Sequence, residues 1–532
     1  MAELDGPERR RGRRGFRLTS KYQISGIRFL LRRLQHALVR SDTRMIDDPQ
    51  RAQSSPLIAG IVAAVIGLGG TAVWSLLSPA GVVDNARIVV DRDTNQMYVR
   101  IANRLDPVTG GLTSARLILG SPEKPVKVSP AEIRKFPHGS LVGIQGAPDV
   151  VDNADPSSIW TVCDTTLTGA AVPLDPVSGL PTTAMAPVKT TAIGGPLAPS
   201  DEVNELSGQQ ARVVGYDSRT WLIYARPDGV VVRSTVDLNN AVVADALGLN
   251  AKDLVLPISA GLFNAIPAEP PLEAPAIAEV GARPEYALDR PLTVGTIVKV
   301  QELSGSTSYY VALGDGVQQV SVTAATMIRA ANRQVGTEPV EVGPDELAAL
   351  PKSTQLAIGY YPAAPVELVS PDHEPVTCWS WSRTGSEPTA QTQVLVGRTL
   401  PLTREQSAGL NALVPAPSSK GMTADQVYLP SDLGRFVQIT GAAVDSKNRE
   451  SFFWIADNGM RYGLDTTDPK SGDATLSSLG LHNAVPAPWV VVSLFAPGPT
   501  LSQNDARIRH GGVLGDRVVG RISDEEMKER AH

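Results

Sequence analysis

An uncharged run of 21 residues, LIAGIVAAVIGLGGTAVWSLL at 57–77, constrains this 532-residue chain more than any other feature. Proline stands on both sides of it, at Pro56 and Pro79. An α-helix rises about 1.5 Å per residue, so a helix of this length crosses the roughly 30 Å hydrocarbon core of a bilayer. No comparable run occurs elsewhere in the sequence. The chain is therefore predicted to span a membrane once, through a transmembrane helix at 54–78.

Charge predicts the orientation of this span. Residues 1–56 carry 13 Lys and Arg against 6 Asp and Glu, whereas the rest of the chain has 36 basic and 49 acidic residues. Lys and Arg beside a span stay in the cytoplasm, so the N-terminus is predicted to be cytoplasmic and the large acidic part external. A cleaved signal peptide is the alternative. Its basic region would be far too long, and its apolar region longer than the usual ~7–15 residues.

The basic N-terminal segment divides into two parts. Residues 1–18 are rich in Gly and Arg and are expected to be a disordered tail. Residues 19–53 are expected to hold a cytoplasmic amphipathic basic helix, because apolar residues recur at helical spacing with arginines on the other faces. Such a helix can lie on the inner leaflet, pack on helices of a partner, or be a passive anchor. The predicted contact residues are Ile27, Leu30, Leu31, Leu34 and Leu38 with Arg28, Arg32 and Arg33.

Both cysteines of the chain, Cys163 and Cys378, lie in the external part. An oxidising compartment would let them pair. Each stands beside tryptophan, in SIWTVC at 158–163 and TCWSW at 377–381, so two apolar strands could form a cross-linked core. Two unpaired buried thiols are the alternative. A metal site is disfavoured because the histidines show no ligand spacing.

Internal repetition predicts the architecture of the external part. Four segments share one order: a β-hairpin, a short helical turn and an apolar residue followed by proline. Asp228-Gly229, Asp315-Gly316 and Asn458-Gly459 are turn signals for three hairpins, whereas the first copy is expected to substitute a longer loop, NRLDPVTGGL at 103–112. The predicted fold class is α+β: a single N-terminal transmembrane helix, then an elongated external body with a central β-rich core domain and four small hairpin–helix repeats.

The expected segments of this body alternate between repeats and core. They are repeat 1 (82–150), a core segment (151–215), repeat 2 (216–272), a linker and core segment (273–300), repeat 3 (301–365), a core segment (366–445), repeat 4 (446–500) and a C-terminal tail (501–532). The central sheet is expected to combine the two cysteine strands with RVVGYD (212–217), GTIVKVQE (295–302), TQVLVGRTLPL (392–402) and GRFVQITGAA (434–443). Pro-rich residues at 173–200 and 267–291 are expected to be linkers.

No motif assigns a catalytic, metal-binding or cofactor-binding residue. The sequence has no GxxxxGK[ST], and the dipeptide Gly-Lys is absent. It also lacks G-x-S-x-G, H-E-x-x-H and a Cys–His constellation. The basic tail shows neither the aromatic interleaving nor the zinc-ligand spacing of nucleic-acid-binding proteins. A structural or assembly role is therefore favoured over an enzyme.

Several motifs, taken together and in order, carry a family resemblance. They are TSKYQISGIRFLLRRLQHALVRSDTRMIDDP (19–49), LTSARLILGSP (112–122), SIWTVCD (158–164), SAGLFNAIP (259–267), PVTCWSW (375–381), GMRYGLD (459–465) and APGPTLSQNDARIRH (496–510). With the span, they cover nearly the whole chain. The sequence resembles EccB, a membrane component of the type VII (ESX) secretion systems of mycobacteria and related actinobacteria.

The resemblance implies a protein of the plasma (inner) membrane with a cytoplasmic N-terminus, one span and a periplasmic body of four repeats around a core. It implies a disulfide between Cys163 and Cys378. The implied function is structural: assembling the periplasmic part of the export channel for WXG100 and PE/PPE-type proteins. The implied partners are the EccC motor ATPase, EccD, EccE and the MycP protease, with EccB itself as a homo-oligomer, a hexamer in the assembly.

The family is often labelled as ATPases, so the resemblance also implies ATP binding and hydrolysis as the alternative function. No Walker pattern supports this label, and no nucleotide-binding residue is assigned. Binding to the cell wall, or an anchored wall enzyme, is a third hypothesis.

Overall fold

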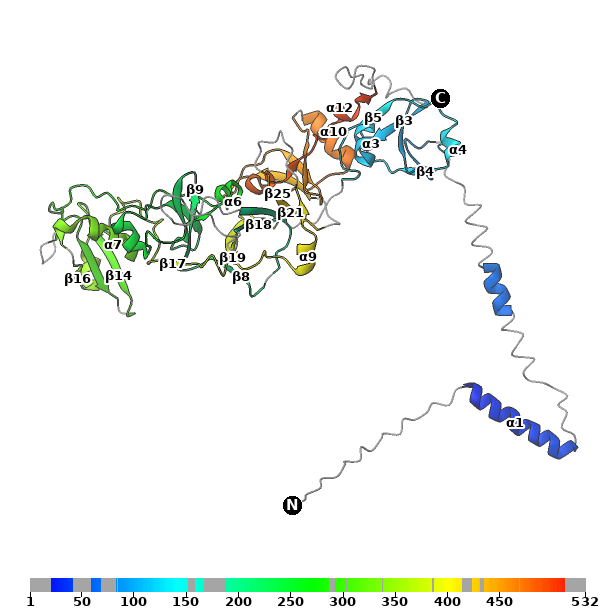
Figure 1. The fold of residues 1–532 in the computed structure, drawn as a ribbon, viewed down its shortest axis with the longest axis horizontal. Coiled ribbons are helices and arrows are strands. Elements are labelled where there is room, and N and C mark those ends of the chain that lie inside the picture. Colours follow the sequence, from blue (N-terminus) through cyan, green and yellow to red (C-terminus); the bar gives the residue numbers. More distant parts are fainter. Residues whose placement is uncertain are drawn as a thin grey trace, which may run out of the picture. The chain divides into compact units, whose positions relative to one another are not determined.

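The chain divides into two compact units in its computed structural model, residues 1–80 and 81–532 (Figure 1). The described residues are 21–41, 59–67, 83, 85–151, 158–166, 188–198, 200–286, 292–302, 304–336, 338–384, 387–413, 423–430, 435–467 and 469–511. The described residues of the first unit are almost all helical. The second unit is rich in strands, with short helices between them.

The first unit contains the amphipathic helix that the sequence predicts. Helix α1 (Lys21–Arg40) is rich in Leu and Arg, which are good helix formers, and contains no proline. Residues 59–67 are also helical. They fall inside the predicted span at 54–78, whose other residues lie outside the described part, as does the tail at 1–18. Within the described residues, no helix combines the length and the apolar character needed to cross a bilayer.

A seven-stranded sheet carries both cysteines. Its order is β20-β21-β7-β6-β18-β19-β8. The bounds of these strands are β6 (Ser158–Thr166), β7 (Val188–Gly194), β8 (Val203–Glu205), β18 (Val376–Arg383), β19 (Gln391–Gly397), β20 (Asn411–Ala412) and β21 (Gln426–Tyr428), and helix α9 (Arg404–Ala408) follows β19. The two central strands, β6 and β18, are buried almost without alternation, so both of their faces are covered although polar residues alternate with apolar ones along them.

Each of the four other sheets has the same order of strands. Three consecutive strands form an antiparallel meander, and a fourth returns to pair in parallel with the first. The four sets are β1 (Ile88–Asp91), β2 (Met97–Ile101), β3 (Arg104–Thr109) and β4 (Val126–Val128); β9 (Gln210–Tyr216), β10 (Arg219–Ala225), β11 (Val231–Thr235) and β12 (Leu256–Pro257); β13 (Ile297–Gln301), β14 (Thr307–Ala312), β15 (Val317–Val320) and β16 (Val340–Val342); and β22 (Arg435–Thr440), β23 (Phe452–Ile455), β24 (Met460–Leu464) and β25 (Val485–Pro488).

Helices stand at matching places in these four sets. One helix links the third strand to the fourth: α3 (Gly111–Leu119), α5 (Ala241–Leu247), α7 (Val322–Ala331) and α10 (Pro469–Leu479). A shorter one follows the fourth strand: α4 (Pro130–Ile133), α6 (Ala260–Ala265), α8 (Pro344–Ala349) and α11 (Trp489–Val492). Local signals fix their ends. Asn240 caps α5 through its side chain, and Gly248, at φ 74°, ends that helix.

Four short strands and a helix complete the sheets. Strands β5 (Leu141–Gly143) and β27 (Arg509–His510) extend the first sheet, β17 (Glu367–Leu368) pairs with β9, and β26 (Ala496–Pro497) pairs with β24. Helix α12 (Gln503–Ala506) packs on α3. The predicted C-terminal tail, 501–532, therefore begins with residues that belong to the folded body, and its residues from 512 lie outside the described part.

Three predicted hairpins are confirmed, and one prediction is wrong. The turns at Asp228-Gly229, Asp315-Gly316 and Asn458-Gly459 join antiparallel strands. The first set has a hairpin as well, because most of the predicted loop at 103–112 is strand β3, which pairs with β2. Leu105 and Val108 of this strand are buried, and Pro107 lies opposite Tyr98 in the register with β2.

The predicted central sheet is also corrected. TQVLVG lies in β19, beside the cysteine strand β18, as predicted. The other three segments do not join that sheet: they are β9, β13 and β22, the first strands of three different sheets. In addition, the predicted linker at 173–200 contains β7, which pairs with β6 over its whole length. Residues 188–194 are therefore part of the core.

Shared hydrophobic clusters connect neighbouring sheets of the second unit. The largest is built on the tryptophans of the seven-stranded sheet and includes Phe263 of α6 and Val437 of β22. A second cluster joins α5 to α7, and a third joins α3 to residues of β23 and β24. Burying these apolar faces is what holds the short elements in place, since isolated hairpins and six-residue helices are not stable alone.

Candidate functional site

Helix α1 presents its predicted contact residues to solvent. The five apolar residues are between 56% and 77% exposed: Ile27, Leu30, Leu31, Leu34 and Leu38. The three arginines, Arg28, Arg32 and Arg33, are also exposed. Single exposed leucines are ordinary, but an exposed apolar stripe along a helix marks a contact surface for lipid or protein. The structure thus places all eight predicted residues on one helix, α1, and leaves them uncovered by the other described residues of its unit.

The two cysteines form the disulfide that was predicted. Cys163 of β6 and Cys378 of β18 are directly opposite each other in the antiparallel register and are fully buried. The bond joins residues 215 positions apart. Trp160, Trp379 and Trp381 on the same two strands are at most 1% exposed. The disulfide lies among apolar side chains, which fits a structural bond and not an exposed redox group.

Asp164 is a buried carboxyl group next to the disulfide. Its Oδ2 accepts a hydrogen bond from the Ser259 backbone N–H at 2.6 Å, and its Oδ1 accepts one from the Thr190 hydroxyl at 2.9 Å. Burial raises the pKa of Asp164 to about 6, although both hydrogen bonds act in the opposite direction. Asp164 thus connects the seven-stranded sheet to the start of α6.

Arg212 of β9 lines the same small internal void as Asp164. Its Nη2 donates to the Glu374 carbonyl at 2.6 Å, and burial lowers its pKa to about 10. Its Nε has no hydrogen-bond partner within the described part of the chain. Because β9 belongs to the second sheet, this pair of ionisable groups lies where two sheets meet. The arrangement is suited to holding the sheets together.

The pKa of Asp164 predicts a pH effect on stability. Its folded pKa of about 6 lies above the ordinary aspartate pKa of 3.8, so between these two pH values the folded state holds a proton that the unfolded chain releases. The stabilisation is complete below about pH 4 and is lost as the pH rises through 6. We expect the free energy of unfolding of wild type, minus that of Asp164→Asn, to fall by about 2–3 kcal/mol between pH 4 and 7.

Chemical denaturation of both proteins across this pH range measures the difference. Subtracting the two free energies of unfolding cancels the contributions of the other titrating groups, because both proteins contain them. A difference that stays constant with pH would contradict the raised pKa of Asp164.

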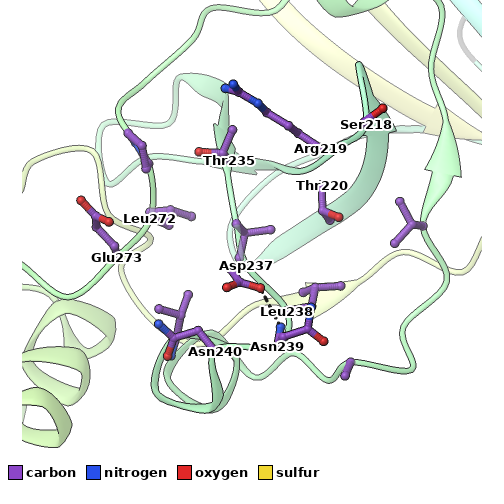
Figure 2. A pocket seen from close by; sticks show the side chains of 15 residues that line it. Ser218, Arg219, Thr220, Thr235, Asp237, Leu238, Asn239, Asn240, Leu272 and Glu273 are labelled. Atoms are coloured by element: carbon purple, nitrogen blue, oxygen red, sulfur yellow. Dashed lines mark hydrogen bonds between the residues drawn. The ribbon is translucent and has the colours of Figure 1, made fainter.

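A cavity of about 670 Å³ lies in the second sheet and beside α5 (Figure 2). Three segments form most of its lining: 218–220 at the start of β10, 235–240 at the end of β11, and 271–273; Val243, Ala251 and Val255 complete it. Asp237 accepts a hydrogen bond from the Asn239 backbone N–H at 2.9 Å, as the dashed line shows. Leu272 and Val236 contribute apolar surface.

The lining of this cavity is polar, open and mixed in charge. Arg219, Asp237, Asn239 and Glu273 are all exposed side chains around it. A Ser or Thr hydroxyl activated by a hydrogen-bonded base would be needed for nucleophilic catalysis, and the described lining residues provide no such pair. The described part of the chain also contains no group of three or more His, Cys, Asp or Glu side chains placed to hold a metal ion. The cavity can accept a polar molecule but offers no catalytic arrangement.

Neither the burial of Asp164 and Arg212 nor the cavity was predicted from the sequence. An acid following a cysteine in an apolar strand, SIWTVCD, is a usable signal for a buried carboxylate. The cavity has no such signal, since its lining segments are distant in the sequence and come together through the pairing of β10 with β11 and of Val236 with Leu272.

Comparison with known proteins identifies the family. The family described as "Type VII secretion system ESX-1, transport TM domain B" (EccB) matches residues 16–514. The "ESX-3 secretion system ATPase EccB3" of Mycolicibacterium smegmatis is 39% identical over 517 residues, which is 96% of this chain and 94% of that protein. The "ESX-1 secretion system ATPase EccB1" of Mycobacterium tuberculosis is 34% identical over 507 residues, 94% of this chain and 97% of that protein.

Solved structures agree with this relationship. A chain of an intact ESX-5 inner membrane complex matches 96% of this chain and 99% of its own length, with a TM-score of 0.70 and 32% identity. The EccB3 dimer from the ESX-3 core complex matches 79% of this chain and 99% of its own, with a TM-score of 0.67 and 35% identity. The strand-rich body described above thus has the fold of these proteins. The chain belongs to the EccB family of type VII secretion systems.

Proposed function

We propose that this protein is a structural component of a type VII secretion inner-membrane complex, in which its body assembles the periplasmic part of the export channel. The observation that carries this proposal is likeness over nearly the whole chain to a chain of an intact ESX-5 inner membrane complex. The described site residues support a scaffold: Asp164 and Arg212 lie where two sheets meet, and α1 presents an exposed apolar stripe that would serve as a docking surface. The exported substrates would be WXG100 and PE/PPE-type proteins.

The proposed topology has one span at 54–78, a cytoplasmic N-terminus and a periplasmic body. The uncharged run at 57–77 and the excess of basic residues before it support this orientation. The disulfide supports an external body, because disulfides persist in oxidising compartments.

The proposed body contains four hairpin–helix repeats around a core sheet. Support comes from the strand order and helix positions that four sheets have in common. Each proposed repeat would begin at its first strand, so repeats 2, 3 and 4 would start at β9, β13 and β22, between 4 and 11 residues before the predicted boundaries at 216, 301 and 446. The seven-stranded sheet is the proposed core.

The proposed partners are the EccC motor ATPase, EccD, EccE and the MycP protease, together with further copies of this chain in a hexamer. The names of relatives solved within inner-membrane and core complexes support an assembly of several proteins.

An ATPase is the second candidate, favoured by the word in the relatives' names. An ATPase function predicts that ATP hydrolysis co-elutes with the purified protein and is lost when residues of its body are mutated. The absence of a Gly-Lys dipeptide anywhere in the sequence excludes a Walker A loop.

Secretion itself tests the proposed function. An in-frame deletion of the gene in its own organism is expected to abolish export of WXG100 proteins into the culture filtrate, and the wild-type gene is expected to restore it. Retained export by the deletion strain, with the other components of the system intact, would contradict a structural role in the channel.

A further inference from the structure

We propose that α1 lies flat on the cytoplasmic leaflet and binds anionic phospholipids, with its apolar stripe among the acyl chains. This inference rests on the proposed topology, which puts α1 on the inner side of the membrane. From the sequence alone, the apolar face of α1 could contact either lipid or a partner protein. We propose that it contacts lipid.

The apolar stripe is continuous and narrow. At 100° per residue, Ile27, Leu30, Leu31, Leu34 and Leu38 fall within about 100° of arc around the helix. All five are more than half exposed in the structure. An apolar stripe of this width, with polar faces on either side, is the pattern of a helix that lies in the plane of a membrane surface.

The arginines flank this stripe on both sides. On the same wheel, Arg28 and Arg32 lie at about 100° and 140° on one side of Ile27, and Arg33 lies at about 120° on the other. All three side chains are exposed. From these positions their long apolar stems can lie along the membrane surface while the guanidinium groups reach the phosphates.

Charge favours lipid over a protein partner. Residues 9–41 contain eleven basic residues and no acidic residue. Protein surfaces carry both signs, whereas an anionic leaflet presents one sign uniformly and attracts polybasic segments beside a span. Because α1 has basic residues and no acidic ones, its charge is more complementary to an anionic lipid surface than to a typical protein surface.

Chain length keeps α1 close to the membrane. Sixteen residues, 41–56, separate α1 from the uncharged run that begins at Leu57. Fully extended, they reach at most about 55 Å. A helix tethered this closely to a span meets the leaflet at high effective concentration, so a weak lipid affinity suffices for stable contact.

The test uses the full-length protein with a single fluorescent label. Both native cysteines form the disulfide, so one introduced cysteine gives one labelling site. Leu31→Cys places an environment-sensitive fluorophore on the stripe, and the matched control His36→Cys places it on the opposite face of α1. Each labelled protein is inserted into nanodiscs of phosphatidylglycerol with phosphatidylcholine, or of phosphatidylcholine alone, with and without quencher-bearing doxyl lipids.

In the anionic discs, the Leu31→Cys label is expected to shift to shorter wavelength and to be quenched by doxyl lipids, whereas the His36→Cys label is not. The shift is expected to be lost in phosphatidylcholine alone, and also when Arg28, Arg32 and Arg33 are replaced by Gln in the anionic discs. Circular dichroism of the arginine variant checks that helix content is unchanged.

Two results would overturn the proposal. One is a Leu31→Cys label that remains unquenched in both kinds of disc. The other is a Leu31→Cys label whose emission shifts to shorter wavelength only in the purified multiprotein complex. That result would show that a protein partner covers the stripe. Either result leaves the proposed channel role standing, because the protein would still insert and the deletion strain would still lose secretion. Failure of the protein to insert into discs at all would instead contradict the proposed span.

Discussion

Replacing Cys163 with serine is expected to lower the free energy of unfolding of the 81–532 unit by about 3–5 kcal/mol. The disulfide joins residues 215 positions apart, so its loss releases a long loop in the unfolded state. Both cysteines are also buried in an apolar cluster with Ile193, Val376 and Leu395, where a serine hydroxyl would find little compensation. Thermal unfolding and limited proteolysis under oxidising conditions measure the effect, as a lower Tm and faster cleavage.

The neighbouring cross-strand pair provides a matched control. Thr161 donates to the Ser380 hydroxyl at 2.9 Å, and the two residues are opposite each other two positions from the disulfide. Ser380→Ala is expected to cost about 1 kcal/mol, and its Tm should still fall on adding a reducing agent. The Tm of Cys163→Ser should not respond to that agent. An unchanged Tm for Cys163→Ser would refute the structural role of the bond.

Replacing Trp381 with alanine is expected to destabilise the same unit by about 3–5 kcal/mol. Trp381 is fully buried and lies opposite Trp160 on the paired strand. Removing its ring leaves a large cavity at the centre of the seven-stranded sheet, and surrounding strands that are hydrogen-bonded on both sides cannot collapse into it. Denaturant unfolding gives the difference.

Phenylalanine at the same position separates packing from hydrogen bonding. The indole N–H of Trp381 has no acceptor among the described residues, so Trp381→Phe loses volume alone and is expected to cost about 1–2 kcal/mol. The indole N–H of Trp160 donates to the Ser158 hydroxyl at 2.9 Å, so Trp160→Phe is expected to cost about 1 kcal/mol more. Equal destabilisation by alanine and phenylalanine at Trp381 would contradict the cavity explanation.

Local patterns in the sequence were sufficient for the elements that depend on local interactions. The stripe of α1 follows from helical spacing, and the turn at Asn458-Gly459 follows from the positive φ that glycine adopts there, 87°. The pairing of Cys163 with Cys378 follows from compartment and from the family resemblance. These features can be predicted because each rests on a few neighbouring residues or on a single covalent bond.

Sheet membership could not be predicted in the same way. Strands β9, β13 and β22 resemble the cysteine strands in composition, yet each begins a sheet of its own by pairing in parallel with a strand at least 40 residues later. Parallel pairing is decided by tertiary packing, which leaves no local signal. The buried Asp164 depends on such packing too, because its partner Ser259 is brought to it from another sheet.

Purification of the tagged full-length protein from its native membrane in mild detergent, followed by mass spectrometry, tests the central claim most directly. A structural component of the inner-membrane complex is predicted to bring EccC, EccD and EccE with it in one large particle. Recovery of this chain alone, with ATP turnover that follows the protein, would contradict the scaffold and favour the enzyme.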